Sequence, residues 1–284
     1  QQRQNFVSVK DETSGKVIIG VEDGANNSYC DLLFYVNASK TIEEPNDRPV
    51  ITPDDGNEPE KPDVTETKTG TLAFEDIWPG GGDYDMNDVI VEYNRAVSFD
   101  KKNQVTKIVD TFTPVHDGAV FANAFAYQVD KGQFGKMTFS ATTEGIHTES
   151  ATSSIIVCPN VKQAIQKVYT ITREFTGGSF NKKDLKSYNP YIIVKYAEGQ
   201  KGRTEVHLPK HEATSLADLS LAGTQKDAYY IDKEGAYPFA IDIPILNFIS
   251  VTEKKSIDTE YPNFKAWADS KGEKYTDWYN NHVN

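Results

Sequence analysis

The sequence is poor in the residues that build disulfide frameworks, zinc sites and redox centres. It has two cysteines and five histidines among 284 residues, and no Cys-x-x-Cys pair. Two cysteines, Cys30 and Cys158, are too few for a disulfide framework. We expect two separate buried thiols. A bond between them would instead tie together the segments on either side of a proline-rich stretch.

Several signatures of common function classes are also missing. No apolar run approaches the about 20 residues that a membrane-spanning helix needs. Acids outnumber bases 42 to 30, which gives a net charge of −12 and argues against nucleic acid or an anionic membrane as a partner. There is no Gly-x-Ser-x-Gly nucleophile elbow, phosphate-binding loop or dinucleotide fingerprint. The sequence therefore predicts no catalytic residues.

The negative charge is concentrated in two short stretches. Residues 41–66 hold nine acids, two bases and five prolines, and residues 71–94 hold six acids and no base. The rest of the chain is nearly neutral. A stretch rich in proline and like charge does not pair into a sheet, so 41–66 is expected to be an extended linker or strap. An ordered loop along the surface is an equally good interpretation.

Most of the chain after residue 66 shows strand signals. Short runs rich in Val, Ile, Thr, Tyr and Phe alternate with turn residues, which favours an all-β fold, an antiparallel, jelly-roll-like β-sandwich. We expect a β unit at 1–40, the linker or strap at 41–66 and the sandwich at 67–284. The expected strands are Val17–Val21, Leu32–Val36, Thr71–Phe74, Asp88–Phe99, Gln104–Phe112, Ala119–Gln128, Lys136–Ala141, Ser153–Val157, Lys167–Phe175, Tyr191–Tyr196, Thr204–Leu208, Ala228–Ile231 and Phe239–Ile243.

One or two short helices are expected near the C-terminus. The run from Tyr261 to Ala268 follows two possible capping residues, has Pro262 in its first turn, and precedes Gly272, which suits a helix end. Its aromatic residues share one side, so the helix is expected to pack on the sheet.

The most informative stretch is the acidic loop between two expected strands, at residues 75–88. Its carboxylates repel one another unless a cation lies among them, and Ca²⁺ takes about 6–8 oxygen ligands. The glycines Gly80–Gly82 would let the backbone turn tightly and offer carbonyl oxygens. We therefore predict a structural Ca²⁺ site. Its expected ligands are Glu75, Asp76, Asp83, Asp85, Asn87 and Asp88.

Other interpretations of this loop remain open. The spacing Asp83-x-Asp85-x-Asn87 opens like an EF-hand, but Asp88 stands where that loop needs glycine. Mg²⁺ and zinc are disfavoured because the donors are many, all from protein oxygens, and no His or Cys is near in sequence. The loop could also be a solvated acidic turn. Glu75 and Asp76 would face opposite ways in a regular strand, so paired-carboxylate hydrolysis is poorly supported.

A degenerate copy of the acidic loop lies near the N-terminus. It keeps three carboxylates, Glu22, Asp23 and Asp31, whereas Asn26 and Ser28 replace the two alternating aspartates. This copy should bind metal weakly or not at all. His207 and His211 are four residues apart, but Pro209 between them argues against a helical zinc pair, so His207 is expected to be packed or on the surface.

These motifs resemble a known family. Glu75-Asp76-x-Trp78-Pro79 followed by Gly82-Asp83-Tyr84-Asp85-x-Asn87-Asp88 resembles the opening motif of the LruC-type domain of bacterial surface proteins and lipoproteins, over about residues 68–281. Residues 5–37 resemble the C-terminal hairpin of a companion acidic-loop repeat domain. Further similar segments are His116-Asp117-Gly118-Ala119, Asn123-Ala124-Phe125-Ala126, Asn189-Pro190-Tyr191-Ile192-Ile193, Glu205-Val206-His207-Leu208-Pro209, Tyr237-Pro238-Phe239-Ala240-Ile241 and the C-terminal run with Tyr261, Pro262, Phe264 and Trp267.

The resemblance implies a secreted or outer-surface protein of Bacteroidetes-like bacteria, with lipid anchoring through a segment not present here. It supplies little biochemistry, because both domains are of unassigned function. We expect a monomeric, non-catalytic, adhesin-like surface domain with a calcium-type loop, which binds an extracellular glycan or protein. The alternative is a metal-dependent hydrolase that acts on surface glycans or peptides at the same loop. A third interpretation is a structural spacer between other domains.

Overall fold

The computed structural model describes residues 6–10, 17–21, 32–36, 64–175, 180–186, 188–199, 202–222 and 229–283. The chain divides into two compact units, Gln1–Glu60 and Lys61–Asn284. Residues 41–63, which hold most of the expected linker or strap, lie outside the described residues. The three carboxylates of the degenerate loop copy and Cys30 lie outside them as well.

The N-terminal unit contains a three-stranded antiparallel sheet in the order β1-β2-β3. Its strands are β1 (Phe6–Lys10), β2 (Val17–Val21) and β3 (Leu32–Val36). The last two coincide with the strands expected from their apolar runs. The first was not among the expected strands, although its β-prone run Phe6–Lys10 fits a strand.

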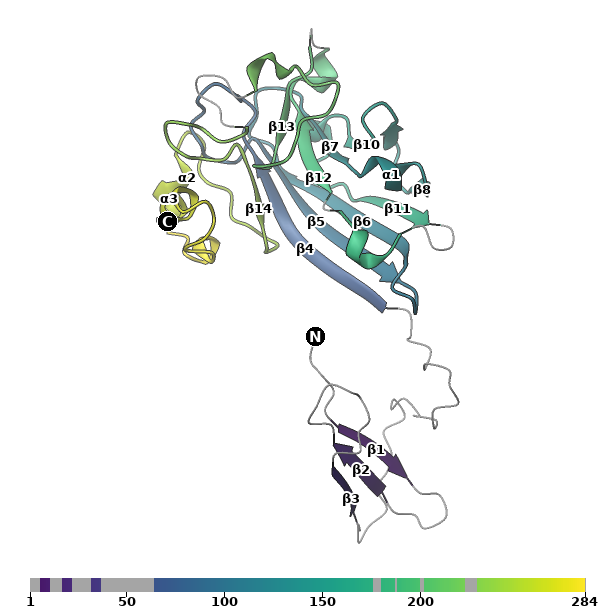
Figure 1. Ribbon diagram of the computed structural model, residues 1–284. Coiled ribbons are helices and arrows are strands. Elements are labelled where there is room, and N and C mark those ends of the chain that lie inside the picture. The colour runs from purple at the N-terminus through teal and green to yellow at the C-terminus, as the bar shows by residue number, and fades with distance from the viewer. Residues whose placement is uncertain are drawn as a thin grey trace. The chain divides into compact units, whose positions relative to one another are not determined.

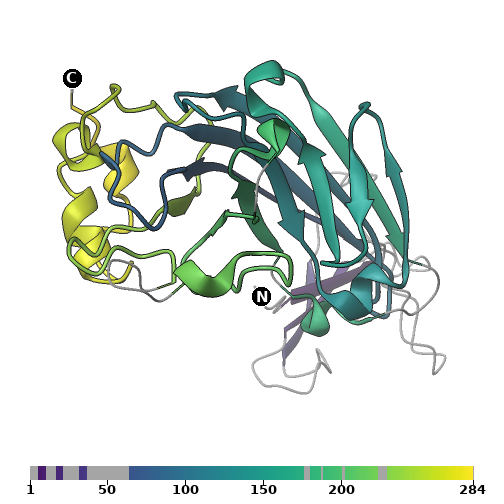
Figure 2. The same ribbon diagram turned by 90° about the horizontal axis from the view of Figure 1, so that it is seen from above.

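The second unit is an all-β sandwich of two antiparallel sheets, as predicted (Figures 1 and 2). The six-stranded sheet has the order β14-β4-β5-β6-β11-β8 and the five-stranded sheet the order β13-β12-β7-β10-β9. The strands are β4 (Val64–Phe74), β5 (Val89–Phe99), β6 (Val105–His116), β7 (Ala124–Gln128), β8 (Met137–Ala141), β9 (His147–Glu149), β10 (Ser154–Cys158), β11 (Tyr169–Phe175), β12 (Asn189–Ile193), β13 (Glu205–His207) and β14 (Ala240–Ile243).

Four features of the sheets differ from the sequence expectation. The expected strand Ala119–Gln128 begins only at Ala124. Strand β4 begins at Val64, so residues 64–66, which we assigned to the linker, pair with residues 97–99 at the end of β5. Strand β9 was not predicted. The expected strand at 228–231 is wrong over its described part, where Ile231 makes a single bridge to Pro238. Short strands such as β9 carry too few residues to show a period.

The main core lies between the two sheets and follows the period of two along each strand. In β4, Leu72 and Phe74 face this core, whereas Ala73 between them belongs to a second cluster on the other side of the sheet. The opposite sheet contributes Phe125 and Ile155, both 0% exposed. The residues of β4 and β5 next to the acidic loop are therefore buried on both faces.

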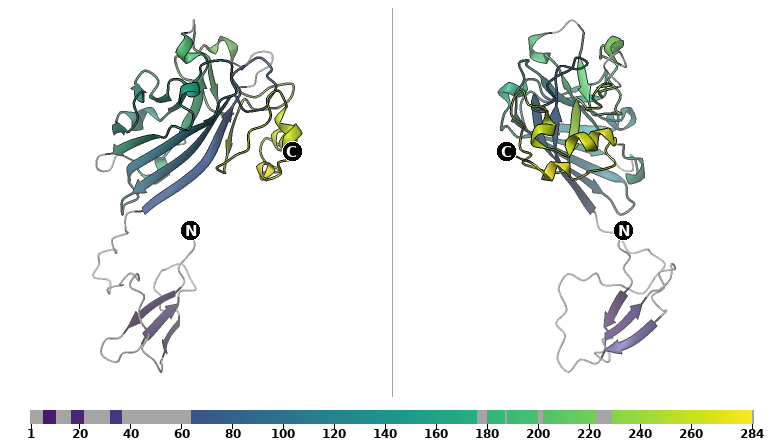
Figure 3. Two further views of the ribbon diagram at one scale, coloured as in Figure 1. Left: turned by 180° about the vertical axis from the view of Figure 1, so that it is seen from behind. Right: turned by 90° about the vertical axis from the view of Figure 1, so that its left-hand side faces the viewer.

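The second cluster is formed by the C-terminal segment, defined here as residues 251–283, packed on the outer face of the six-stranded sheet. The segment lies beside β14 and β4 in Figures 1 and 3. Its helices are short: α2 (Ile257–Glu260), α3 (Phe264–Asp269) and the 3-10 turn η5 (Trp278–Asn280). Tyr261, Phe264 and Trp278 are each at most 2% exposed, so the predicted packing of aromatic residues on the sheet is confirmed.

The single helix expected from Tyr261 to Ala268 is interrupted. Residue Tyr261 has φ −125° and ψ 80°, outside the helical region, because the proline ring of Pro262 disfavours a helical residue before it. Helix α3 therefore begins only at Phe264. Gly272, at φ 84°, donates its N–H to the carbonyl of Trp267 at 3.0 Å, so it closes the end of the helix as predicted.

The remaining short helices are α1 (Lys131–Phe134) and the 3-10 turns η1 (Val161–Gln163), η2 (Lys182–Asp184), η3 (Tyr196–Glu198) and η4 (Leu219–Leu221). Among the described residues no helix has the length and apolar character needed to span a membrane. Cys158 is a free thiol buried at the end of β10, as expected for this cysteine.

Candidate metal site in the loop between β4 and β5

The acidic loop is the connection of the long hairpin formed by β4 and β5. The two strands pair in register up to Phe74 and Val89, so residues 75–88 form the turn. The N–H of Glu75 donates to the carbonyl of Phe239 at 2.9 Å, which ties the start of the loop to the segment before β14. The loop is therefore fixed at the edge of the main core.

Three of the predicted ligands meet in this loop. Glu75, Asp83 and Asp85 each place one carboxylate oxygen within 4.8 Å of the others. Glu75 is 0% and Asp85 2% exposed, whereas Asp83 is exposed. The donor set consists of oxygens alone, the set that hard cations such as Ca²⁺ prefer.

Glu75 has an unusual environment for a carboxylate. Its Oε1 atom accepts a hydrogen bond from the N–H of Met86 at 2.5 Å, but its buried Oε2 atom has no hydrogen-bond partner. Burial raises the pKa of Glu75 well above its ordinary value, and the negative charges of Asp88, Asp85 and Asp83 raise it further. A buried oxygen without a partner costs free energy, which a cation in contact with it would recover.

The backbone of the loop is shaped to bring these groups together. Tyr84 and Met86, which alternate with the acids, have φ values of 56° and 55°. This left-handed conformation costs about 1–2 kcal/mol for a residue with a side chain. Gly82 lies so close to Glu75 that an added Cβ would stand 2.6 Å from Oε2. The loop thus has a strained backbone at Tyr84 and Met86, and Gly82 closely approaches Glu75. Both features lie next to the three grouped carboxylates.

Two other predicted ligands form a separate group. The Oδ2 atom of Asp88 accepts from the N–H of Asp76 at 2.7 Å, and the Oδ2 atom of Asp76 accepts from Nδ2 of Asn123 at 2.7 Å. Burial, followed by the charge of Asp76, raises the pKa of Asp88 to about 8. Glu75 and Asp76 thus point into different groups, as expected for consecutive residues that leave a strand.

Asn87, the sixth predicted ligand, is buried with 1% exposure. Its Nδ2 donates to the carbonyl of Val251 at 3.1 Å, and its Oδ1 has no hydrogen-bond partner. An added Cβ on Gly118 would lie 2.5 Å from this oxygen, and the N–H of Gly118 donates to the carbonyl of Asn87 at 3.0 Å. Asn87 therefore anchors the loop to two neighbouring segments.

Sequence reasoning missed the partners that come from distant parts of the chain. Asn123 and Gly118 hold the loop from the side of β6 and β7, and Lys254 donates its backbone N–H to Oδ2 of Asp85 at 2.9 Å. The first two lie in the motifs on which the family resemblance rests, which was a usable signal. Nothing in the sequence around Lys254 indicates a backbone donor.

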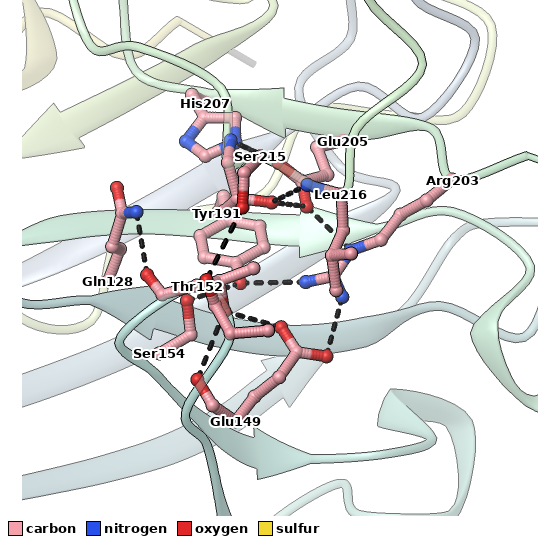
Figure 4. A network of polar contacts seen from close by, with 12 residues as sticks. Gln128, Glu149, Thr152, Ser154, Tyr191, Arg203, Glu205, His207, Ser215 and Leu216 are labelled. Atoms are coloured by element: carbon pink, nitrogen blue, oxygen red, sulfur yellow. Dashed lines mark hydrogen bonds and ion pairs between the residues drawn. The ribbon is translucent and has the colours of Figure 1, made fainter.

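A second polar site lies on the five-stranded sheet, around His207 in β13 (Figure 4). The ring of His207 is 0% exposed and contacts Asn189 through Nδ1 at 2.8 Å and Glu205 through Nε2 at 2.9 Å. It stacks on Tyr191 with ring centres 4.4 Å apart. Burial lowers the pKa of His207. Of the two placements expected for His207, packed or on the surface, the structure shows the packed one.

The same network holds one arginine beside a groove. Arg203 donates through Nη1 to Glu149 at 2.7 Å and through Nη2 to the hydroxyl of Tyr191 at 2.9 Å, and its Nε lies 2.5 Å from Oε1 of Glu205 (Figure 4). The groove has a volume of about 420 Å³, within the range of small-ligand sites. Its walls are Ile193, Tyr196, Gly202, Arg203 and Leu216.

The fold and the acidic loop define a β-sandwich protein with an oxygen-rich candidate cation site. Residues 103–279 match the family described as "Domain of unknown function (DUF4842)", and the chain belongs to this family. The matched range begins after the acidic loop, so membership in the family does not depend on that loop.

The fold is also similar to a solved structure. A crystal structure from Bacteroides ovatus, named "Putative lipoprotein", superposes with a TM-score of 0.59 at 16% sequence identity, and the match covers 98% of this chain and 91% of the other. At this identity the likeness shows the fold alone. No curated protein matches the chain.

Proposed function

We propose that this protein is a secreted or outer-surface β-sandwich protein of the LruC type, in which a Ca²⁺ bound at the β4–β5 loop has a structural role. Its function is adhesion through the binding of an extracellular glycan or protein. The surface location draws support from the sequence motifs that resemble surface proteins and from the name of the Bacteroides ovatus structure.

One observation carries the calcium proposal. The Oε2 atom of Glu75 is buried without a hydrogen-bond partner, and oxygens of Asp83 and Asp85 lie within 4.8 Å of a Glu75 oxygen. Three carboxylates at this separation repel each other, and the repulsion grows as the site loses water. A divalent cation turns that repulsion into attraction and occupies the unused oxygen.

The donors favour Ca²⁺ among common cations. Zinc sites usually include His or Cys, which the three grouped residues lack. Mg²⁺ demands near-ideal octahedral geometry and keeps several waters, whereas Ca²⁺ accepts irregular sets of protein oxygens. The exposed side of the site at Asp83 leaves room for water ligands to complete the coordination.

The burial of the site favours a structural over a catalytic ion. Because Glu75 and Asp85 are 0% and 2% exposed, a substrate could reach the ion only from the side of Asp83, where a hydrolytic ion would need room for both substrate and water. The loop residues that contact neighbouring segments, Asp85 and Asn87, bond to backbone groups of the C-terminal segment. These contacts fit an ion that holds segments together. They favour the structural role over the hydrolase.

The glycan or protein ligand is best placed at the groove beside Arg203. The walls of the groove include the guanidinium of Arg203, which carries N–H donors, and the ring of Tyr196, which offers an aromatic surface. Sugar hydroxyls accept hydrogen bonds from such donors, and the apolar faces of sugar rings pack on aromatic side chains.

Thermal unfolding with and without calcium tests the proposal. Ca²⁺ at 1 mM should raise the Tm relative to EGTA, because a ligand that binds only the folded state stabilises it. In Glu75→Gln the amide oxygen can still accept from Met86 while the negative charge is removed. We expect this variant to fold and to lose most of the calcium-dependent shift.

Glu144→Gln is the matched control, because it removes the same charge at an exposed position between β8 and β9. It should keep the full shift. If calcium leaves the Tm of the unaltered protein unchanged, or if both variants respond to calcium alike, the proposed site is wrong.

A further inference from the structure

The acidic loop also makes hydrogen bonds to the C-terminal segment. Two consecutive loop residues bond its backbone directly: the carbonyl of Tyr84 accepts from the N–H of Ile257 at 2.8 Å, and Oδ2 of Asp85 accepts from the N–H of Lys254 at 2.9 Å. Asn87 adds a third bond, to the carbonyl of Val251. The loop therefore contacts the segment on both sides of Asp85, a grouped carboxylate.

The residue between these contacts is part of the apolar packing of the segment. Met86 is 0% exposed and belongs to the same cluster as Tyr261, Phe264 and Trp278. Its N–H donates to Oε1 of Glu75. The position of Met86 in the aromatic cluster therefore depends on the placement of a carboxylate in the candidate cation site.

The apolar cluster beneath the segment is separate from the core between the sheets. The inner core is built from both sheets, whereas the outer cluster combines Ala73, Ile90 and Ile241 of the six-stranded sheet with the C-terminal segment. Proteins open in such cooperative units with different free energies. The segment can therefore lose its packing while the inner core stays closed.

We propose that cation occupancy of the Glu75–Asp83–Asp85 site controls the docking of the C-terminal segment. This inference rests on the cation binding proposed above. With the cation bound, Asp85 and Glu75 are held where they accept from Lys254 and Met86. Without it, the grouped carboxylates repel one another and the buried Oε2 of Glu75 lacks a partner, so the loop relaxes and residues 251–283 separate from the sheet.

Hydrogen exchange of the full chain, measured by mass spectrometry in 1 mM CaCl₂ and in EGTA, tests the proposal. We expect the amides of residues 251–283 to exchange at least about tenfold faster in EGTA, since their protection depends on docking. Strands β6 and β11, whose inward side chains lie in the cores on the other face of the sheet, should keep their protection in both conditions.

The same two variants, Glu75→Gln and Glu144→Gln, are measured in both conditions. Glu75→Gln lowers the charge of the group, so the segment should stay protected in EGTA and respond little to calcium. Glu144→Gln should behave like the unaltered chain. Calorimetric titration with CaCl₂ on the same samples reports the binding itself.

The outcomes separate the two proposals. Calcium binding by titration, with exchange in residues 251–283 that does not depend on calcium, overturns the docking inference and leaves the proposed site intact. Uniform loss of protection in all strands also overturns it, because the segment would then not open as a separate unit. Absence of calcium binding overturns the proposed site and this inference together.

Discussion

Arg95 donates to Asp110 through two nitrogens, from Nε to Oδ1 at 2.6 Å and from Nη2 to Oδ2 at 3.1 Å. Arg173 adds a bond to Oδ2 at 2.9 Å, and the hydroxyl of Tyr127 adds another at 3.1 Å. Asp110 is 1% and Arg173 2% exposed. One buried carboxylate thus pairs with two arginines, and the charges of Arg95 and Arg173 hold its pKa below the ordinary value against the effect of burial.

Removal of this carboxylate should be strongly destabilising. Asp110→Ala leaves the buried Arg173 and the largely buried Arg95 without their partner, and breaking a buried ion pair from one side costs about 3–5 kcal/mol. Asp269→Ala is the control, because Asp269 pairs with Lys265 in the exposed i,i+4 geometry that contributes about 0.5 kcal/mol or less. Urea unfolding of both variants measures the difference, and a loss below about 1 kcal/mol for Asp110→Ala would contradict the argument.

The sequence was sufficient for those parts of the fold that depend on local pattern. The strands on either side of the glycine-rich turn were predicted from their β-prone runs, β4 only from Thr71 onward, and the C-terminal aromatics were expected on the sheet because they share one side. The partners of those elements could not be predicted. The triad of Arg95, Asp110 and Arg173 joins three strands through charges that in sequence look like ordinary surface residues.

The candidate site shows the same limit at the level of single residues. The spacing of the acidic loop predicted six oxygen-bearing side chains around one ion. The structure brings Glu75, Asp83 and Asp85 together and pairs Asp76 with Asp88, because consecutive residues leaving a strand point to opposite sides. That geometry was available from the sequence, but the contributions of Asn123 and of the C-terminal segment depend on contacts between distant parts of the chain.

Acid should weaken the fold partly through His207. Burial lowers the pKa of its imidazole below the ordinary 6.5, so the unfolded chain binds the proton more readily than the folded chain. The contribution of this group is complete above about pH 6.5 and is lost as the pH falls toward the folded pKa, by at most about 1.4 kcal/mol per pH unit.

His207→Gln should remove this part of the pH dependence between pH 7 and 5. His147→Gln, at an exposed position in β9, should leave it in place. Urea unfolding at several pH values gives the slope for each protein. Equal slopes for the unaltered chain and His207→Gln would contradict the assignment.

The thiol of Cys158 should be protected by the fold. It is 1% exposed, and burial raises its pKa, so little reactive thiolate is present near neutral pH. In a Cys30→Ala background, a colourimetric disulfide reagent should react with Cys158 at least about a hundredfold more slowly in buffer than in unfolding concentrations of urea. Fast reaction in buffer would show that β10 opens locally.

Two adjacent glycines allow a direct test of the geometry around Glu75. A Cβ at Gly82 would lie 2.6 Å from Oε2 of Glu75, closer than real Cβ contacts allow, whereas a Cβ at Gly81 would meet nothing nearer than 3.7 Å, at the hydroxyl of Tyr84. Neither glycine has the positive φ that strains an alanine. Gly82→Ala must therefore move the carboxylate that faces the proposed ion, while Gly81→Ala leaves it in place.

The expected result is a loss of calcium affinity in one variant only. Gly82→Ala should weaken calcium binding at least about tenfold, equivalent to about 1.4 kcal/mol, and Gly81→Ala should stay within about twofold of the unaltered protein. Calorimetric titration with CaCl₂ measures both, and the Tm in EGTA shows whether each variant still folds. Equal affinities for two folded variants would mean that Oε2 of Glu75 does not contact the ion, because a displaced ligand oxygen must alter the binding that depends on it.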